Sequence, residues 1–113
     1  MSINSKAKGA TNERKWARIC TDEGYPSKRT AQVAGNYKAI SEGVPDVICD
    51  SLPLFHFEVK SGARPHLWNA IDQAIRDKRT EQFAIAALHK DYCPWLVGMT
   101  ADDFFKIVRG DHL

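Results

Sequence analysis

The sequence predicts a single α/β domain of the mixed, α+β type, with a five-stranded mixed sheet flanked by helices in the order αβββαββα. Three observations lead to this prediction. The chain has 113 residues, which is the length of one ordinary domain. Hydrophobic residues make up 43% and charged residues 27%, a globular balance that argues against a disordered chain. Segments that alternate apolar and polar residues, as strands do, are separated by segments of helical period.

The first helix is expected over residues 12–23, after a flexible basic arm formed by residues 1–10. Thr11 can cap this helix and Gly24 can end it. Glu13 falls in the first turn, where the helix dipole favours an acid. It should lie at the rim of the buried face, which carries Ala17 and Cys20. The outward face carries the basic residues Arg14, Lys15 and Arg18.

Strands and loops are expected between this helix and the middle of the chain. Residues 25–34 read as an edge strand, and residues 35–44 as a polar loop whose length hints at function or mobility. Residues 46–49 and 55–60 are strand-like, and the turn-like residues 50–54 between them predict a hairpin.

The second half of the chain is expected to hold a helix, two strands and a last helix. The helix spans residues 65–79, with a buried stripe of Leu67, Ile71, Ala74, Ile75 and the Lys78 stem. Residues 82–88 read as a strand buried on both faces, and residues 95–99 as a further strand. Thr100 caps the last helix and Gly110 ends it. The apolar residues of this helix are expected to point inward: Phe104, Phe105, Ile107 and Val108.

The hairpin carries the chemical information. In its second strand Phe55, Phe57 and Val59 take one face, and His56, Glu58 and Lys60 take the other. If Cys49 lies opposite Phe55 and closes a five-residue turn, each residue of one strand faces the residue of the other strand whose number adds to its own to give 104. Asp46 then lies directly opposite Glu58, with Cβ atoms about 4.5–5.5 Å apart.

Two carboxylates at that separation repel each other unless a positive charge lies between them. A divalent cation with oxygen ligands is the natural occupant, and Mg²⁺ is usually held by one or two carboxylates. Lys60 lies on the same face, where its ammonium can reach a metal-bound water or a phosphate. This set suits phosphodiester hydrolysis. The alternative is an ordinary surface hairpin with a Glu/Lys pair.

The sequence Val44-Pro45-Asp46, followed by Phe57-Glu58-Val59-Lys60, resembles the signature of the PD-(D/E)xK nuclease superfamily. Other features fall where the family has them: Glu13 on the first helix, Lys8-Gly9 near the start, Ser41 and Gly43 before Pro-Asp, and Gln73 on the helix after Glu-x-Lys. The resemblance spans about residues 5–100. Within the superfamily the chain is most similar to the small Holliday junction resolvases of archaea and their phages, which are single-domain homodimers.

This resemblance implies a restriction-endonuclease-like core and a role for each matching residue. Asp46 and Glu58 become Mg²⁺ ligands, with Mn²⁺ as an alternative ion, and Lys60 becomes the catalytic lysine. Glu13 becomes a further acid at the metal, and Gln73 a positioning residue. Ser41 matches a loop serine that touches the site. Glu13 can also be read as a plain helix-terminal acid, and Gln73 as a surface glutamine.

The implied function is a metal-dependent DNA endonuclease that makes paired nicks in four-way junctions as a homodimer. Two alternatives belong to the nucleic-acid class: a nuclease of the same fold that acts on flaps, forks or duplex, and a non-catalytic DNA-binding module. A third is a small interaction protein in which the motifs are accidental.

The charge distribution suggests a polyanionic partner near the N-terminus, and the alternative is an ordinary solvated surface. The net charge is only +2, but residues 1–38 hold eight bases and three acids, a net charge of +5, and residues 39–113 hold a net charge of −3. The candidate contacts with DNA phosphates are Lys6, Lys8, Arg14, Lys15, Lys28 and Arg29, with Ser41.

The cysteines and the apolar runs of the sequence predict the cellular compartment of the protein. Cys20, Cys49 and Cys93 are an odd number without a CxxC motif, which fits neither a disulfide framework nor a zinc site. The longest apolar run, residues 83–88, is too short to cross a bilayer, and no signal peptide is recognisable. We expect a cytoplasmic protein, in a bacterium, an archaeon or a phage-infected cell, without a membrane partner.

Overall fold

The computed structural model describes residues 5–30 and 44–111 of the chain. Its centre is a five-stranded sheet with the spatial order β1 (Ser27–Arg29), β2 (Val47–Cys49), β3 (Phe55–Ser61), β4 (Phe83–His89) and β5 (Leu96–Gly98). β3 and β4 are parallel, and the other three neighbouring pairs are antiparallel. The predicted mixed sheet is therefore confirmed.

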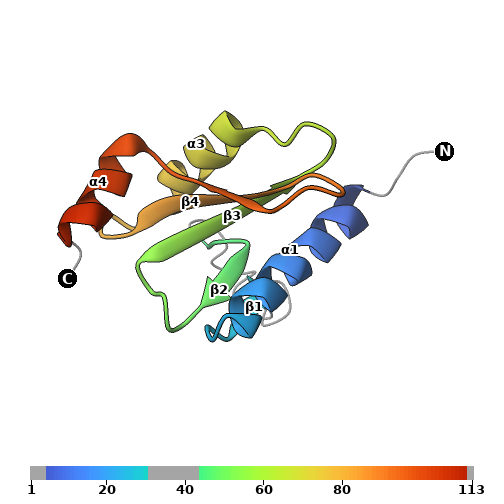
Figure 1. Ribbon diagram of the computed structural model, residues 1–113, viewed down its shortest axis with the longest axis horizontal. Coiled ribbons are helices and arrows are strands. Elements are labelled where there is room, and N and C mark those ends of the chain that lie inside the picture. Colours follow the sequence, from blue (N-terminus) through green and yellow to red (C-terminus); the bar gives the residue numbers. More distant parts are fainter. Residues whose placement is uncertain (1–4, 31–43, 112–113) are drawn as a thin grey trace.

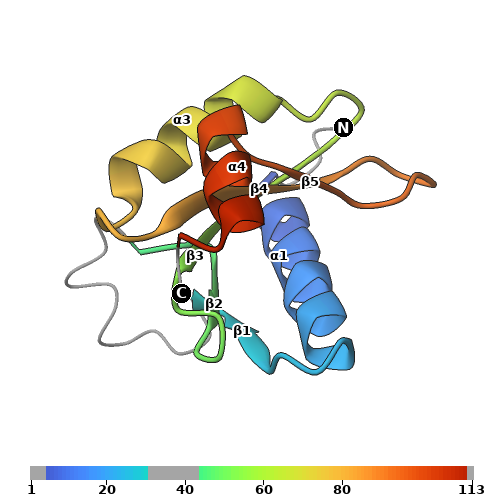
Figure 2. The same cartoon turned by 60° about the vertical axis from the view of Figure 1, so that its left-hand side comes forward.

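Three helices are present in the described part of the chain: α1 (Ser5–Asp22), α3 (Leu67–Asp77) and α4 (Ala101–Arg109). The element order is αβββαββα, as predicted. α1 packs on β1, β2 and β3, whereas α3 packs on β3 and β4. Figures 1 and 2 show these two helices on opposite faces of the sheet. The two central strands are therefore covered on both sides, which explains why β4 is buried over almost its whole length.

The start of α1 differs from the prediction. The helix begins at Ser5, not at residue 12, so Thr11 is not its cap and Glu13 is not in its first turn. Residues 5–10 are mostly lysine and alanine, which are strong helix formers, and Gly9 costs only about 1 kcal/mol inside a helix. The expected flexible arm is wrong for residues 5–10. Residues 1–4 lie outside the described part.

The face of the sheet under α1 holds the larger hydrophobic core. Trp16, Ala17 and Cys20 of α1 pack against Phe57 and Val59 of β3, as the alternation in β3 predicts. The Trp16 ring meets Phe57 edge-on, with a centroid separation of 5.6 Å. Polar side chains on the same strand are thereby directed to the opposite face, toward α3.

The buried face of α3 differs in part from the predicted stripe. Ile71 and Ala74 are buried as expected, but Leu67 and Ile75 are exposed, and Ala70, which was not in the stripe, is fully buried. The helix begins at Leu67, because His66 is its N-cap and accepts a hydrogen bond from Asn69 N–H. The small residues Ala70 and Ala74 allow close approach to the sheet, and this rotates the larger side chains outward.

The last helix has the predicted ends but not the predicted packing. Thr100 caps it by accepting a hydrogen bond from Asp103 N–H, and Gly110 ends it with a left-handed φ of 77°. No residue of α4 is buried, and Phe104, Phe105 and Val108 are half or more exposed. The prediction of an inward direction is wrong for Phe104, Phe105 and Val108, whereas Ile107 is partly buried and packs against the main core, as expected. Figure 2 shows α4 set apart from α1 and α3, the two helices that cover the sheet.

Several other expectations can be compared with the described residues. β1 lies at the edge of the sheet, as predicted. Cys20 and Cys49 are buried free thiols, and Cys93 is exposed. The predicted loop at 35–44 falls almost wholly outside the described residues. Across residues 5–30 and 44–111, no helix is both long and apolar enough to traverse a bilayer.

Candidate functional site

The register of the β2–β3 hairpin is the one predicted. Val47 pairs with Phe57, so the residue numbers of this pair sum to 104, as predicted. Asp46 lies just before β2, and its N–H donates to the carbonyl of Phe57 over 3.0 Å, so the pairing is irregular at this point. The carboxyl groups of Asp46 and Glu58 nevertheless lie close enough to share a side-chain hydrogen bond. The two acids of the motif are therefore brought together from positions that are twelve residues apart in the sequence.

Hydrogen bonds to both the backbone and the side chain of Asp46 hold this residue in place. Thr30 N–H donates to the Asp46 carbonyl over 3.0 Å, and the Thr30 hydroxyl donates to the carbonyl of Pro45. Val59 N–H donates to Asp46 Oδ2 over 2.9 Å. The Asp46 carboxylate thus accepts a hydrogen bond from the backbone of β3, and this bond holds the Asp46 side chain beside that strand.

Glu58 is almost completely buried, with 1% of its surface exposed. Its Oε1 lies 2.9 Å from Nε2 of His56, which is itself fully buried two residues earlier on the same face of β3. Glu58 Oε2 has no hydrogen-bond partner among the described residues, and neither has His56 Nδ1. A buried carboxylate oxygen without a partner is unfavourable unless a proton or a cation reaches it.

Burial and mutual repulsion change the ionisation of this pair. Burial, followed by the charge of Glu58, raises the pKa of Asp46 to about 7. Burial, with the charges of Asp77 and Glu13, raises the pKa of Glu58 to about 7. Burial lowers the pKa of His56, which favours its neutral form at pH 7. Without a cation, the two carboxyls therefore hold a proton near neutral pH, and a metal would have to displace it.

Glu13 comes to the same region from α1. Its Oε1 lies 2.7 Å from Nε of Arg29 on the edge strand β1, and both side chains are about four-fifths buried. Burial, with the charge of Asp46, raises the pKa of Glu13, while the hydrogen bond from Arg29 opposes this shift. Glu13 is thus an acid close to Asp46 that already has a cationic partner, and this pairing could not be predicted from the sequence.

Lys60 follows Glu58 on the same face of β3 and is half-buried. Its ammonium acts on both Asp46 and Glu58 and opposes the increase in their pKa that burial produces. Gln73 lies half-buried on α3, and no contact joins it to Asp46, Glu58 or Lys60 among the described residues. Electrostatic interactions therefore link Glu13, Asp46, Glu58 and Lys60 in one region, and Gln73 lies apart. Among the described residues, however, the three predicted ligands Glu13, Asp46 and Glu58 do not lie close enough together to form a metal-holding group.

Sequence reasoning did not include Asp77, which closes α3. One ligand atom each from His56, Glu58 and Asp77 lie within 4.8 Å of one another, so these residues could hold a metal ion. The alternation of β3 already put His56 on the face of Glu58. No sequence signal indicated Asp77, because its position depends on how α3 crosses β3.

The predicted DNA-contacting bases are distributed over α1 and β1. Arg14, Lys15 and Lys28 are exposed, whereas Arg29 is engaged by Glu13. A shallow groove of about 500 Å³ runs along α1 and is lined by Thr11, Arg14, Lys15, Arg18, Ile19 and Trp95. The side chains of Lys6 and Lys8 and the whole of Ser41 lie outside the described part of the structure.

The donors around Asp46 fit a hard divalent cation. Asp46, Glu58 and Glu13 offer only carboxylate oxygens, the ligand type that Mg²⁺ prefers, and Mn²⁺ accepts the same set. Glu58 Oε2 has no hydrogen-bond partner when both carboxyls are ionised, and a side-chain hydrogen bond joins Glu58 to Asp46 when one of them carries a proton. Scans of protein-family models, curated proteins and solved structures found no match to this chain.

Proposed function

We propose that this protein is a metal-dependent DNA endonuclease that cuts four-way junctions by phosphodiester hydrolysis. The observation that carries the proposal is the proximity of the Asp46 and Glu58 carboxyl groups at the β2–β3 hairpin, with Lys60 near both. A buried pair of carboxylates lowers the stability of the free protein, and a binding module without catalysis has no need of it. The restriction-endonuclease-like core belongs to the same proposal, because the observed mixed sheet and element order are compatible with it.

In this proposal each residue has a separate task. Asp46 and Glu58 hold Mg²⁺ or Mn²⁺, and Glu13 orients the water in the site from α1. A bound Mg²⁺ supplies a water of lowered pKa and offsets charge on the phosphate oxygens. Lys60 stabilises the charge that develops on the transferred phosphate. Gln73, which follows from the family resemblance alone, positions the DNA backbone.

The exposed bases supply affinity for the phosphate backbone. Arg14 and Lys15 line the groove along α1, and Lys28 is exposed on the edge strand. Such contacts position DNA without reading its sequence, which suits an enzyme that recognises the shape of a junction.

A homodimer would supply the two sites that paired cuts require. The exposed apolar side chains of β5 and α4 favour this assembly: Leu96, Val97, Phe104, Phe105 and Val108. An apolar patch of several hundred Å² is typical of a protein–protein interface. A two-fold dimer uses the same patch on both subunits.

The test is a cleavage assay on a labelled four-way junction with Mg²⁺, and with EDTA as the metal-free control. We expect symmetric nicks from the wild type, and losses of about 100-fold or more from Glu58→Gln and Lys60→Met. Glu81→Gln, which changes an exposed acid on the turn before β4, is the matched control and should cleave normally.

A panel of substrates separates the alternatives. Equal rates on duplex, flap and junction would replace the resolvase proposal by a general nuclease of the same site. Junction binding that is indifferent to Mg²⁺ and yields no product would indicate a binding module and overturn the enzymatic proposal.

A further inference from the structure

The face of β3 opposite the main core holds a second group of potential metal ligands. His56 and Glu58 project from β3, and Asp77 comes from the last turn of α3, with one ligand atom of each within 4.8 Å of the others. We propose that these three residues form an inner cation site for a transition metal such as Zn²⁺ or Mn²⁺. This inner site is separate from the Mg²⁺ site at Asp46, with which it shares only Glu58.

The buried polar atoms of this group are the first support. His56 is fully buried and Glu58 is 1% exposed. Each nevertheless keeps one polar atom without a hydrogen bond among the described residues, His56 Nδ1 and Glu58 Oε2. Polar atoms that are buried in this way are normally paired or bound to a metal. An ion is a natural means of satisfying a histidine and a carboxylate at the same time.

The position of Asp77 is the second, independent support. An acid in the last turn of a helix faces the negative end of the helix dipole, which is unfavourable without a cation. Within the described residues, no hydrogen bond or ion pair holds the Asp77 carboxylate. The half-buried Asp77 side chain places a carboxylate oxygen within 4.8 Å of the ligand atoms of the buried pair.

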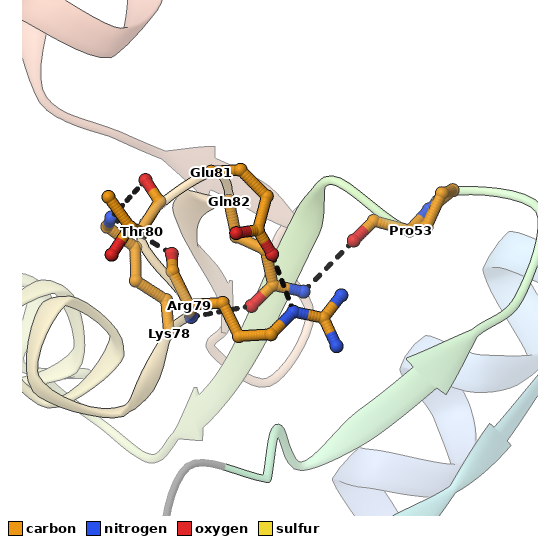
Figure 3. Close-up of polar contacts among 6 residues, drawn as sticks. All are labelled: Pro53, Lys78, Arg79, Thr80, Glu81 and Gln82. Atoms are coloured by element: carbon orange, nitrogen blue, oxygen red, sulfur yellow. Dashed lines mark hydrogen bonds and ion pairs between the residues drawn. The ribbon is translucent and has the colours of Figure 1, made fainter.

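The neighbouring cations do not neutralise Asp77. Lys78 Nζ donates to the carbonyls of Arg79 and Thr80, and Arg79 Nε lies 2.7 Å from Glu81 (Figure 3). Gln82 fixes this turn by accepting from Arg79 N–H and donating to the Pro53 carbonyl (Figure 3). Lys78 and Arg79 therefore both bind partners within residues 79–81, and neither forms an ion pair with Asp77.

The donor set determines the class of ion. One imidazole and two carboxylates suit Zn²⁺, Mn²⁺, Co²⁺ or Fe²⁺, whereas Mg²⁺ and Ca²⁺ take oxygen ligands almost alone. Ligand bonds of about 2.0–2.2 Å require the three ligand atoms to lie closer together than the 4.8 Å limit within which they are found. Three protein ligands leave a position for water.

The experiment uses Co²⁺ as a spectroscopic probe on the metal-stripped full chain, without DNA and in excess Mg²⁺. The wild type should bind one equivalent with visible d–d absorption, which Mg²⁺ does not abolish. Asp77→Ala should weaken binding by about 10-fold or more, and His56→Gln should do the same. Asp72→Ala, the same change at an exposed position of α3, is the matched control. Cys93→Ser excludes the exposed thiol as the ligand.

The variants also distinguish the inner site from the proposed catalytic one. Asp46→Asn should keep the Co²⁺ spectrum, although we expect it to lose junction cleavage. The inner site is refuted if the wild type binds no Co²⁺, if Asp77→Ala binds as the wild type does, or if Mg²⁺ removes the signal. Should His56→Gln fail to fold, the half-buried Asp77→Ala still decides the question. Because no DNA is present, these outcomes are independent of the nuclease proposal.

Discussion

Replacing Asp46 by asparagine should stabilise the metal-free protein while it removes the metal site. Asparagine keeps an oxygen that can accept the hydrogen bond of Val59 N–H, now observed at 2.9 Å to Asp46 Oδ2. It removes the negative charge that lies opposite Glu58. The substitution therefore leaves the hairpin intact and separates the electrostatic cost of the carboxylate pair from the geometry that positions it.

The magnitude follows from the pKa of Asp46, which burial and the charge of Glu58 raise from 3.8 to about 7. Because the folded pKa is the higher one, the unfolded chain releases this proton first, and the stability of the wild type falls as the pH rises from about 4 to about 7. Each pKa unit corresponds to about 1.4 kcal/mol. The gain in Asp46→Asn should reach about 2–4 kcal/mol at pH 8, fall to about two-fifths of that at pH 5, and vanish well below pH 4.

Urea unfolding in EDTA across this pH range measures the gain. Asp50→Asn, an exposed acid in the turn of the same hairpin, is the control and should show no such trend. Saturating Mg²⁺ should raise the stability of the wild type, by about 2.7 kcal/mol at 100 times its Kd, and leave Asp46→Asn unchanged. A variant less stable than the wild type at pH 8, or a gain that does not change with pH, would refute the reasoning.

Three further predictions concern the surroundings of the site. Arg29→Gln should cost about 1–2 kcal/mol in urea unfolding, because it leaves Glu13 without its partner beside Asp46. Adding Glu13→Gln should recover part of that loss, and strict additivity of the two changes would contradict the ion pair. Gly110→Ala forces a side chain onto a φ of 77° and should speed amide exchange in α4 about 5-fold; unchanged exchange would argue against this C-cap. Phe105→Glu, at a half-exposed position, should convert a dimer to a folded monomer in sedimentation, and an unchanged mass would exclude this face.

Features that depend on neighbouring residues in the chain could be predicted from the sequence. The alternation in residues 55–60 determines which side chains of β3 enter the core, and the turn length sets the register that pairs Val47 with Phe57 and so brings Asp46 near Glu58. Thr100 and Gly110 mark the ends of α4 for the same reason, since caps act through local backbone hydrogen bonds.

Features that depend on the packing of one element across another were decided only by the tertiary structure. The approach of Ala70 and Ala74 to the sheet sets the rotation of α3, and this alone brings Asp77 to the buried pair on β3. The apolar residues of α4 form a helical stripe in the sequence, yet of these Ile107 packs against the core, whereas Phe104, Phe105 and Val108 stay exposed among the described residues. Likewise, the Glu13–Arg29 pair joins a helix to an edge strand sixteen residues later. Periodicity reports which face of an element is apolar, but not which element, if any, lies against that face.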